Sequence, residues 1–233
     1  MNIVISQPRY LPALNYLQRL YFADKFVLLD NVQRQHRGVE NRNKLLISEC
    51  EKWITIPVIS STKEVISNTI VDNSWVEKHK EAIRQNYRHH PYYSDELLEQ
   101  YYLEVNESHA YVDVLETSLK NLSKMFAIPM KLLRASTLDI PSDKKGVENL
   151  FWICRTIGAD TYISGSNGRA YGVTEYFAPR GIEVLYHDFK YPTYSQKGRE
   201  IFTPWLAFFD PLFNCGTDYI KEIVRSKPTL YRE

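Results

Sequence analysis

The chain has 233 residues, of which 44% are hydrophobic and 24% are charged, as in ordinary globular domains. Its formal net charge of +1 argues against bulk nucleic acid as a partner. No apolar run approaches the roughly 18 residues of a membrane span, and the first residues lack the basic start of a secretory leader. The three widely spaced cysteines are typical of a reducing compartment, so we expect a cytoplasmic protein.

The first 30 residues predict a parallel crossover unit. Residues 1–5 and 26–29 are short, continuous apolar runs, as in strands that are buried on both faces. Between them, residues 14–22 place apolar side chains at helical spacing. A strand, a helix and a second strand in this order form a parallel unit, and such sheets bind ligands beyond the carboxyl ends of their strands.

The next segments predict a hairpin followed by a block of helices. Apolar runs at 44–47 and 53–58 flank an ECEK turn, which favours an antiparallel hairpin. Helical periodicity then recurs within residues 74–127, which we expect to form a helical subdomain or cap on a single domain of residues 1–233. The three predicted helices of this block cover residues 74–87, 95–105 and 110–127.

The remainder of the chain alternates strands with a helix. Apolar runs at 131–135, 161–164 and 182–186 predict strands, and residues 141–157 predict a helix that Gly158 ends. This alternation predicts an α/β fold with a mostly parallel, three-layer (Rossmann-like) sheet, a helical insertion or cap and a small antiparallel hairpin.

Polar residues follow several of the predicted parallel strands. Because the carboxyl ends of parallel strands share one rim, we expect these residues to converge on one cleft. They are Gln7, Asp30, Gln33, the loop 164–168, His187 and Asp188. Within this set His187 and Asp30 are the candidate general bases, and the alternative for His187 is a hydrogen-bonded rim histidine.

The SGSNG loop contributes Ser164, Gly165, Asn167 and Gly168 as candidate ligand-binding residues. Glycine lets a ligand approach the backbone closely, and amide N–H groups at such a loop bind phosphate. A simple turn from strand to helix also needs glycine, so both interpretations stay open.

The triplet Asn41-Arg42-Asn43 is unusual at the start of a strand. An arginine there grips a phosphate or carboxylate with two hydrogen bonds, and the flanking amides bind hydroxyl groups. The structural alternative is that Arg42 pairs with an acidic neighbour.

Other candidates rest on residue type alone. Tyr10, Tyr16 and Tyr194 are able to stack on a sugar or base, although core packing explains any single tyrosine as well. Cys215 is either a nucleophile or a buried structural thiol. No histidine spacing typical of a metal site is present, and no cofactor is evident.

Seven sequence blocks resemble the WbqC family. They are the QPxYxP start, ADKFVLLDxVQ, NRN, WITIPV, TYISGSNG, YPTYSQ and DPLFNCG, the last of which contains Asn214. The resemblance implies a protein of bacterial O-antigen and related surface-polysaccharide synthesis, and it supports a binding role for residues 41–43 and Asn214.

These observations lead to one functional hypothesis and two alternatives. The first is a tailoring transferase that moves an acyl or aminoacyl group onto the amine of a nucleotide-linked amino sugar. Its donor is an acyl-CoA, an acyl carrier protein or an aminoacyl-tRNA. The second is a non-catalytic protein of the same pathway that binds the sugar nucleotide. The third is an ATP-dependent amide-bond-forming enzyme on a nucleotidyltransferase-like fold, although Asn15-Tyr16 stands where that superfamily has Gly-His.

Overall fold

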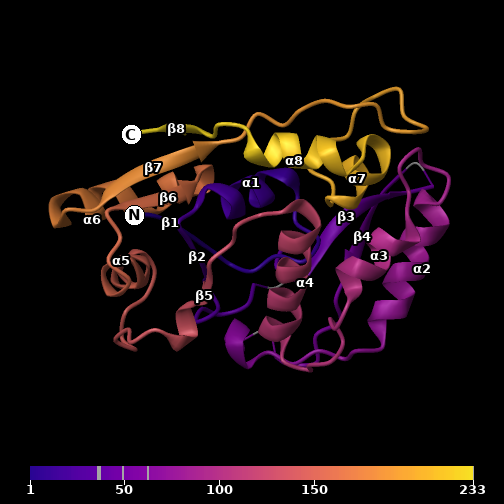
Figure 1. Ribbon diagram of the computed structural model, residues 1–233. Helices are drawn as coiled ribbons and strands as arrows, with labels where there is room; N and C mark the ends of the chain where they lie inside the picture. The colour runs from indigo at the N-terminus through magenta and orange to yellow at the C-terminus, as the bar shows by residue number, and fades with distance from the viewer. Residues whose placement is uncertain (36–37, 49, 62, 233) are drawn as a thin grey trace.

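The computed structural model describes residues 1–35, 38–48, 50–61 and 63–232, and it contains a six-stranded sheet (Figure 1). The strand order is β5-β2-β1-β6-β7-β8, and only β8 runs antiparallel to its neighbour. This mostly parallel order confirms the predicted fold class. The strands are β1 (Asn2–Ser6), β2 (Lys25–Leu28), β5 (Leu132–Arg134), β6 (Thr161–Gly165), β7 (Glu183–Asp188) and β8 (Thr229–Tyr231).

Helices cover both faces of the sheet, which makes three layers (Figure 1). Alternate side chains of β1 point to opposite faces, so that Val4 joins the core beneath one set of helices and Ile3 and Ile5 join the core beneath the other. The first set is α1 (Leu14–Phe22), α4 (Tyr111–Phe126) and α8 (Thr217–Arg225); the second is α5 (Val147–Thr156) and α6 (Val173–Phe177).

The predicted helical block shares its core with the sheet. Helices α2 (Trp75–Tyr87) and α3 (Asp95–Tyr102) bury Ile83 and Leu98 in the same cluster that contains Leu14 of α1. The single domain over residues 1–233, with residues 74–127 as a helical subdomain or cap, stays a prediction.

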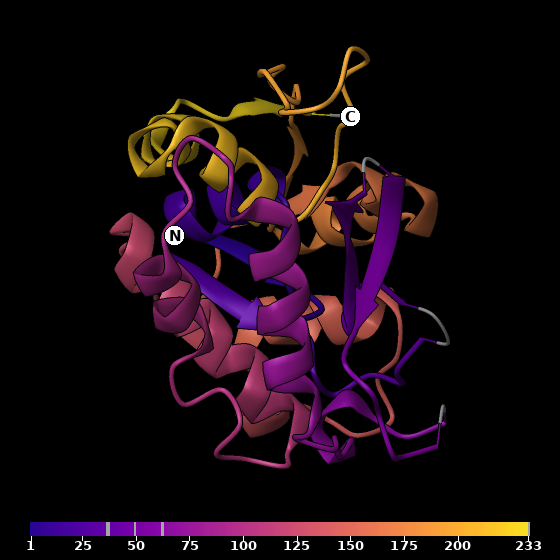
Figure 2. The same ribbon diagram turned by 90° about the vertical axis from the view of Figure 1, so that its right-hand side faces the viewer.

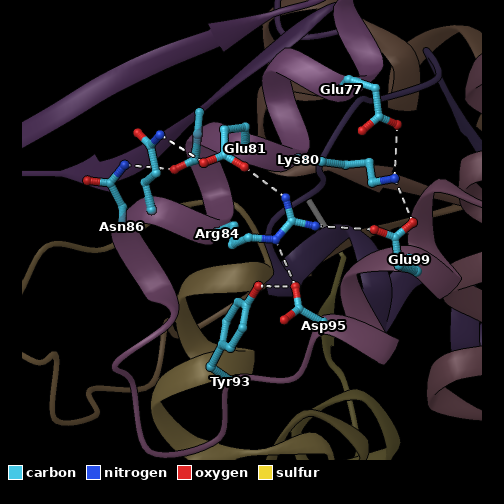
Figure 3. A network of polar contacts seen from close by, with 10 residues as sticks. Glu77, Lys80, Glu81, Arg84, Asn86, Tyr93, Asp95 and Glu99 are labelled. Atoms are coloured by element: carbon cyan, nitrogen blue, oxygen red, sulfur yellow. Dashed lines mark hydrogen bonds and ion pairs between the residues drawn. The ribbon is translucent and has the colours of Figure 1, made fainter.

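A network of charged side chains ties α2 to α3 on the surface (Figure 3). Arg84 of α2 bonds to Glu81 on its own helix and to Asp95 and Glu99 on α3, while Lys80 also reaches Glu99. The Arg84 side chain is 33% exposed, so solvent screens these pairs and each contributes little to stability. The network therefore orients two helices rather than forming a ligand site.

The hairpin stands apart from the main sheet, at the side that Figure 2 shows. It consists of β3 (Arg42–Ile47) and β4 (Cys50–Thr55), and Ile47 pairs with Cys50. Residues 50–52 of the predicted ECEK turn are instead extended within β4, and Glu49 lies outside the described residues. As the alternation predicts, Ile54 is buried while Trp53 is 47% exposed.

The helix predicted over 141–157 begins late, because Gly146 precedes α5 with a φ of 55°, which a helix does not accept. The predicted helix 95–105 ends at Tyr102. Beyond residue 186 the sequence analysis assigned no element, whereas the chain forms α7 (Phe209–Cys215), α8 and β8. Within the described ranges, no helix is both long enough and apolar enough to cross a membrane.

Candidate functional site

A cavity of about 520 Å³ opens at the carboxyl edge of the parallel strands. It is lined by Ser6 and Gln7 at the end of β1, by Ser164 and Gly165 at the end of β6, and by Asp188 at the end of β7. Strand β1 pairs with β2 on one side and with β6 on the other, so the chain order reverses at β1. Open α/β sheets bind their ligands at such a reversal.

The cavity brings together only part of the predicted site. Gln7, Ser164, Gly165, Gly168, His187 and Asp188 line it. Asn167 belongs to the same turn, but its side chain lies outside the described part of the chain. The other candidates are not among the lining residues: they are Tyr10, Tyr16, Asp30, Gln33, Asn41, Arg42, Asn43, Tyr194 and Asn214.

Asp30 is fully buried and both of its oxygens accept hydrogen bonds from Ser136. The backbone N–H donates to Oδ1 at 2.8 Å and the hydroxyl donates to Oδ2 at 2.6 Å. These bonds join the segment after β2 to the segment after β5. Gln33 lies three residues further on and pairs through its backbone with Val65.

Two of the predicted stacking tyrosines lie in the core. The Tyr10 hydroxyl is 2.8 Å from Nδ1 of His79 and 2.7 Å from the hydroxyl of Tyr102. Tyr16 is also fully buried, and its hydroxyl donates to the carbonyl of Gln7 at 3.3 Å. Tyr16 thus supports the strand end that lines the cavity.

The Asn41-Arg42-Asn43 triplet organises the hairpin. The Asn41 amide donates to the carbonyl of Ile56, and the Asn43 amide donates to the carbonyl of Leu11. The Arg42 guanidinium stacks 4.1 Å from the ring of an exposed tryptophan on β4. These contacts explain the unusual composition of the triplet through local structure.

Two arginines that the sequence analysis did not select line the cavity. The guanidiniums of Arg9 and Arg19 lie 5.7 and 5.4 Å from the ring centre of Tyr16. Arg19 is only 6% exposed, and its buried Nε has no hydrogen-bond partner in the part of the chain that the structure describes. Among the described residues, neither arginine forms an ion pair.

Burial of these cations is reflected in their pKa values. Burial, followed by repulsion from Arg9, lowers the pKa of Arg19 to about 10. Burial also lowers the pKa of Arg9, although the charge of Glu40 partly offsets it. Buried charges are normally paired. Two adjacent cations that lack a bonded carboxylate therefore make this end of the cavity suited to a multiply charged anion.

The glycines of the SGSNG loop allow close packing around Arg19 and Ser164. A Cβ on Gly165 would lie 3.2 Å from Nη1 of Arg19, and a Cβ on Gly168 would lie 1.9 Å from Oγ of Ser164. Glycine at 165 lets the guanidinium lie against the strand end, and glycine at 168 lets the turn close over Ser164.

His187 lies beside the cations, and its tautomer follows from its neighbours. Its Nε2 is 2.7 Å from Oε1 of Gln18. The Gln18 amide nitrogen donates to the carbonyls of Ile223 and Ser226 at 3.2 and 3.3 Å, which assigns the amide orientation. Oε1 must then accept from Nε2–H, so Nδ1 is left as the unprotonated nitrogen.

The charge state of His187 is set by the same surroundings. Burial, followed by the positive charge of Arg19, lowers its pKa to about 4, while Asp188 acts in the opposite direction. The imidazole is therefore neutral at neutral pH. A neutral ring with a free Nδ1 accepts a proton or a hydrogen bond, although a pKa near 4 makes it a weak base in the empty cavity.

The predicted residues Tyr194 and Asn214 belong to a buried cluster around Asp210. One Asp210 oxygen accepts from the Tyr194 hydroxyl at 2.7 Å and from the Gln196 amide at 2.8 Å, and the other accepts from the Tyr87 hydroxyl at 3.1 Å. The Asn214 amide donates to the Asp210 carbonyl. Burial raises the pKa of Asp210. The cluster fastens the segment after β7 to helices α2 and α7.

Cys215 follows this cluster. Burial raises the pKa of its thiol to about 11, and the charge of Asp210 adds to this effect. The thiol is therefore protonated at neutral pH, which favours the structural interpretation over a nucleophile.

The residues that the sequence analysis missed had partial signals. Arg9 lies in the same segment as Gln7, just after the end of β1. Gln18 and Arg19 carried no such signal, because Gln18 is buried by the packing of α1 against α8 and Arg19 lies against Gly165 at the end of β6. Phe189 and Trp205 also line the cavity, and of these two only Phe189 directly follows a strand of the structure, β7.

Comparison with known proteins places this α/β chain in a family. The model of the WbqC-like protein family matches residues 7–222, so the chain belongs to that family. The chain is 28% identical over 230 residues to the uncharacterized protein Rv1507c of Mycobacterium tuberculosis. The aligned region covers 94% of this chain and 97% of that protein. No solved structure matches the chain.

Proposed function

We propose that this protein is a tailoring transferase of surface-polysaccharide biosynthesis that transfers an acyl or aminoacyl group to the amine of a nucleotide-linked amino sugar. One observation carries the proposal: the buried guanidinium of Arg19 and the half-buried one of Arg9 lie beside a neutral histidine in one cavity, and neither forms an ion pair within the described ranges. The pathway is taken from the family resemblance. The volume of about 520 Å³ is in the range of small-molecule sites.

In this proposal Arg9 and Arg19 bind the diphosphate. The diphosphate supplies the negative charge that carboxylate partners of the two arginines would otherwise supply. Planar guanidiniums hold phosphate oxygens with paired hydrogen bonds. The bound anion also offsets the charge of Arg19, which is one of the two causes that lower the pKa of His187. The imidazole thus becomes a stronger base when the ligand is present.

His187 then removes the proton from the attacking amine through Nδ1. The new bond joins the amine nitrogen to the acyl carbon, and the bond from that carbon to the donor sulfur or oxygen breaks. The proton passes from the imidazolium to the departing thiol or hydroxyl group, so charge and atoms balance. Gln18 holds the ring in the required tautomer.

The first test is the mass of the sugar after incubation with a donor. A UDP-linked amino sugar is incubated with acyl-CoA, acyl carrier protein or aminoacyl-tRNA, and a gain in mass with one of them is expected. Saturable binding of the sugar nucleotide without any gain in mass favours the non-catalytic alternative instead. Release of pyrophosphate from ATP favours the amide-bond-forming alternative.

The second test separates chemistry from binding. His187→Asn keeps a polar side chain beside Gln18 but removes the base, so turnover is expected to fall by roughly 10²–10⁴-fold while affinity for the sugar nucleotide changes little. His89→Asn is the matched control, since His89 is exposed and lies outside the cavity. Unchanged turnover in His187→Asn removes that residue from the mechanism.

A further inference from the structure

Part of the cavity lining is aromatic. Phe189, Trp205 and Tyr171 line the cavity as well, at a distance in the sequence from the cationic residues. Tyr171 is 71% exposed and Trp205 is 47% exposed, so both lie where the cavity opens to solvent. Large aromatic side chains are usually buried to a greater extent. Exposed rings at the opening of a cavity are typical of a stacking surface.

The backbone of Trp205 has a strained conformation. Its φ is 64°, in the left-handed region that side chains other than glycine rarely adopt. Such outliers persist where the surroundings hold them and are frequent at ligand-binding positions. The exposed ring is therefore held in place by a conformation that the chain alone disfavours.

The segment before Trp205 is held by the Asp210 cluster. Gln196 Oε1 accepts from the backbone N–H of Thr203 at 2.7 Å, and its Nε2 donates to the carbonyl of Thr203 at 2.9 Å and to Asp210 at 2.8 Å. The Tyr194 hydroxyl donates to Asp210 as well. Residues of the YPTYSQ block thus hold the segment that precedes Trp205 in place, and Trp205 lines the cavity.

The segment after Trp205 is held just as firmly. The N–H groups of Ala207 and Phe208 donate to the carbonyls of Lys44 and Pro12. The Trp205 ring packs 4.7 Å from the ring centre of Tyr191. Anchoring on both sides presents the ring in a preformed position, which lowers the entropy lost when a ligand stacks on it.

We propose that Trp205, with Phe189 and Tyr171, forms a stacking subsite for a nucleobase. Because Arg9 and Arg19 bind the diphosphate in the proposed function, on which this inference rests, one ligand would contact both the cations and the aromatic rings. The ligand class is then a nucleoside diphosphate, alone or linked to a sugar. Base stacking on aromatic rings tolerates different bases, so the subsite selects a nucleoside over a plain anion more strongly than it selects one base.

The test compares the affinities of four probes by titration calorimetry: inorganic pyrophosphate, UDP, GDP and ADP. For the wild-type protein, at least one nucleoside diphosphate is expected to bind ten times more tightly than pyrophosphate. Trp205→Leu is expected to remove most of this advantage and to leave pyrophosphate binding unchanged. Trp205→Tyr retains a stacking ring and is expected to restore most of the advantage.

A matched control is available because Trp53, on the hairpin, is also 47% exposed but does not line the cavity. Trp53→Leu is expected to bind all four probes as the wild type does. Two results would overturn the stacking subsite: equal affinities for pyrophosphate and the nucleoside diphosphates, or a higher affinity for nucleoside diphosphates that survives in Trp205→Leu. Neither result would contradict anion binding by Arg9 and Arg19. Failure of the wild type to bind any probe would overturn the proposed function itself.

Discussion

Replacing Arg19 with methionine should stabilise the unliganded protein. Burial and Arg9 lower the pKa of Arg19 from its ordinary value to about 10, and one pKa unit corresponds to about 1.4 kcal/mol. The charged side chain is therefore less favourable in the fold than in water by about 3 kcal/mol. Its stacking on Tyr16 returns about 1–2 kcal/mol. Methionine has a similar length without the charge, so the net gain is about 1–2 kcal/mol.

Urea denaturation measures this gain directly. For a chain of this size, thermal unfolding should shift upward by roughly 2–4 °C for each kcal/mol. Arg155→Met is the matched control, because Arg155 also stacks on an aromatic ring, 5.0 Å from Trp152, but is exposed. That substitution relieves no buried charge and should change the free energy of unfolding by less than about 0.5 kcal/mol.

The same variant should lose the anion site. Pyrophosphate at 100 times its dissociation constant stabilises a protein with one site by about 2.7 kcal/mol, and this shift is expected for the wild type and for Arg155→Met only. If Arg19→Met is less stable than the wild type, the argument from uncompensated burial is wrong. If Arg19→Met still responds fully to pyrophosphate, Arg19 does not bind the anion.

Four further predictions follow from individual contacts. His79 and His187 both have pKa values of about 4 in the fold, whereas the unfolded chain takes up these protons near pH 6.5. Stability should therefore fall as the pH drops from 6.5 to 4, by up to about 3 kcal/mol for each histidine, and urea unfolding across this range measures the loss. Asp210→Asn replaces an acceptor of three side-chain hydrogen bonds and should reduce the free energy of unfolding by about 1–3 kcal/mol. An unchanged free energy of unfolding would contradict a stabilising role for the cluster around Asp210. Arg84→Ala should cost about 1 kcal/mol or less, and the cost should shrink in 1 M salt; a cost independent of salt would rule out a screened ion-pair network. Gln18→Leu should release the Nε2–H tautomer of His187, which the ¹⁵N chemical shifts of the ring report, and unchanged shifts would show that another group holds the proton.

The parallel half of the fold was predictable because its strands are buried on both faces. Continuous apolar runs marked β1 and β2, and the helix between them has the predicted bounds of Leu14–Phe22. Helix α7 carried no such signal, since six of its seven residues are buried and no periodicity remains. Helix α8 was detectable, because Ile220, Ile223 and Val224 recur at helical spacing after Gly216.

The site was only partly predictable, for a reason of sequence distance. Residues at the ends of parallel strands share a rim whatever their separation, and that rule alone brings Gln7, Gly165 and His187 to one cavity. The role of Asp30 depends instead on Ser136, which is 106 residues away in the sequence. The burial of Gln18 depends on α8, whose packing against α1 no local pattern specifies.

Arg19 connects recognition of the ligand with the chemistry proposed for His187. Without a ligand, its charge helps to keep the pKa of His187 near 4, so the imidazole takes up almost no protons at neutral pH. A diphosphate beside Arg19 offsets that charge, and the pKa of His187 rises toward the range where a histidine acts as an efficient base. The buried cation lowers the stability of the empty protein, and a carboxylate partner would remove that loss. Such a partner would also block the anion and uncouple the base from ligand binding, which explains why an unpaired cation is more useful here than a salt bridge.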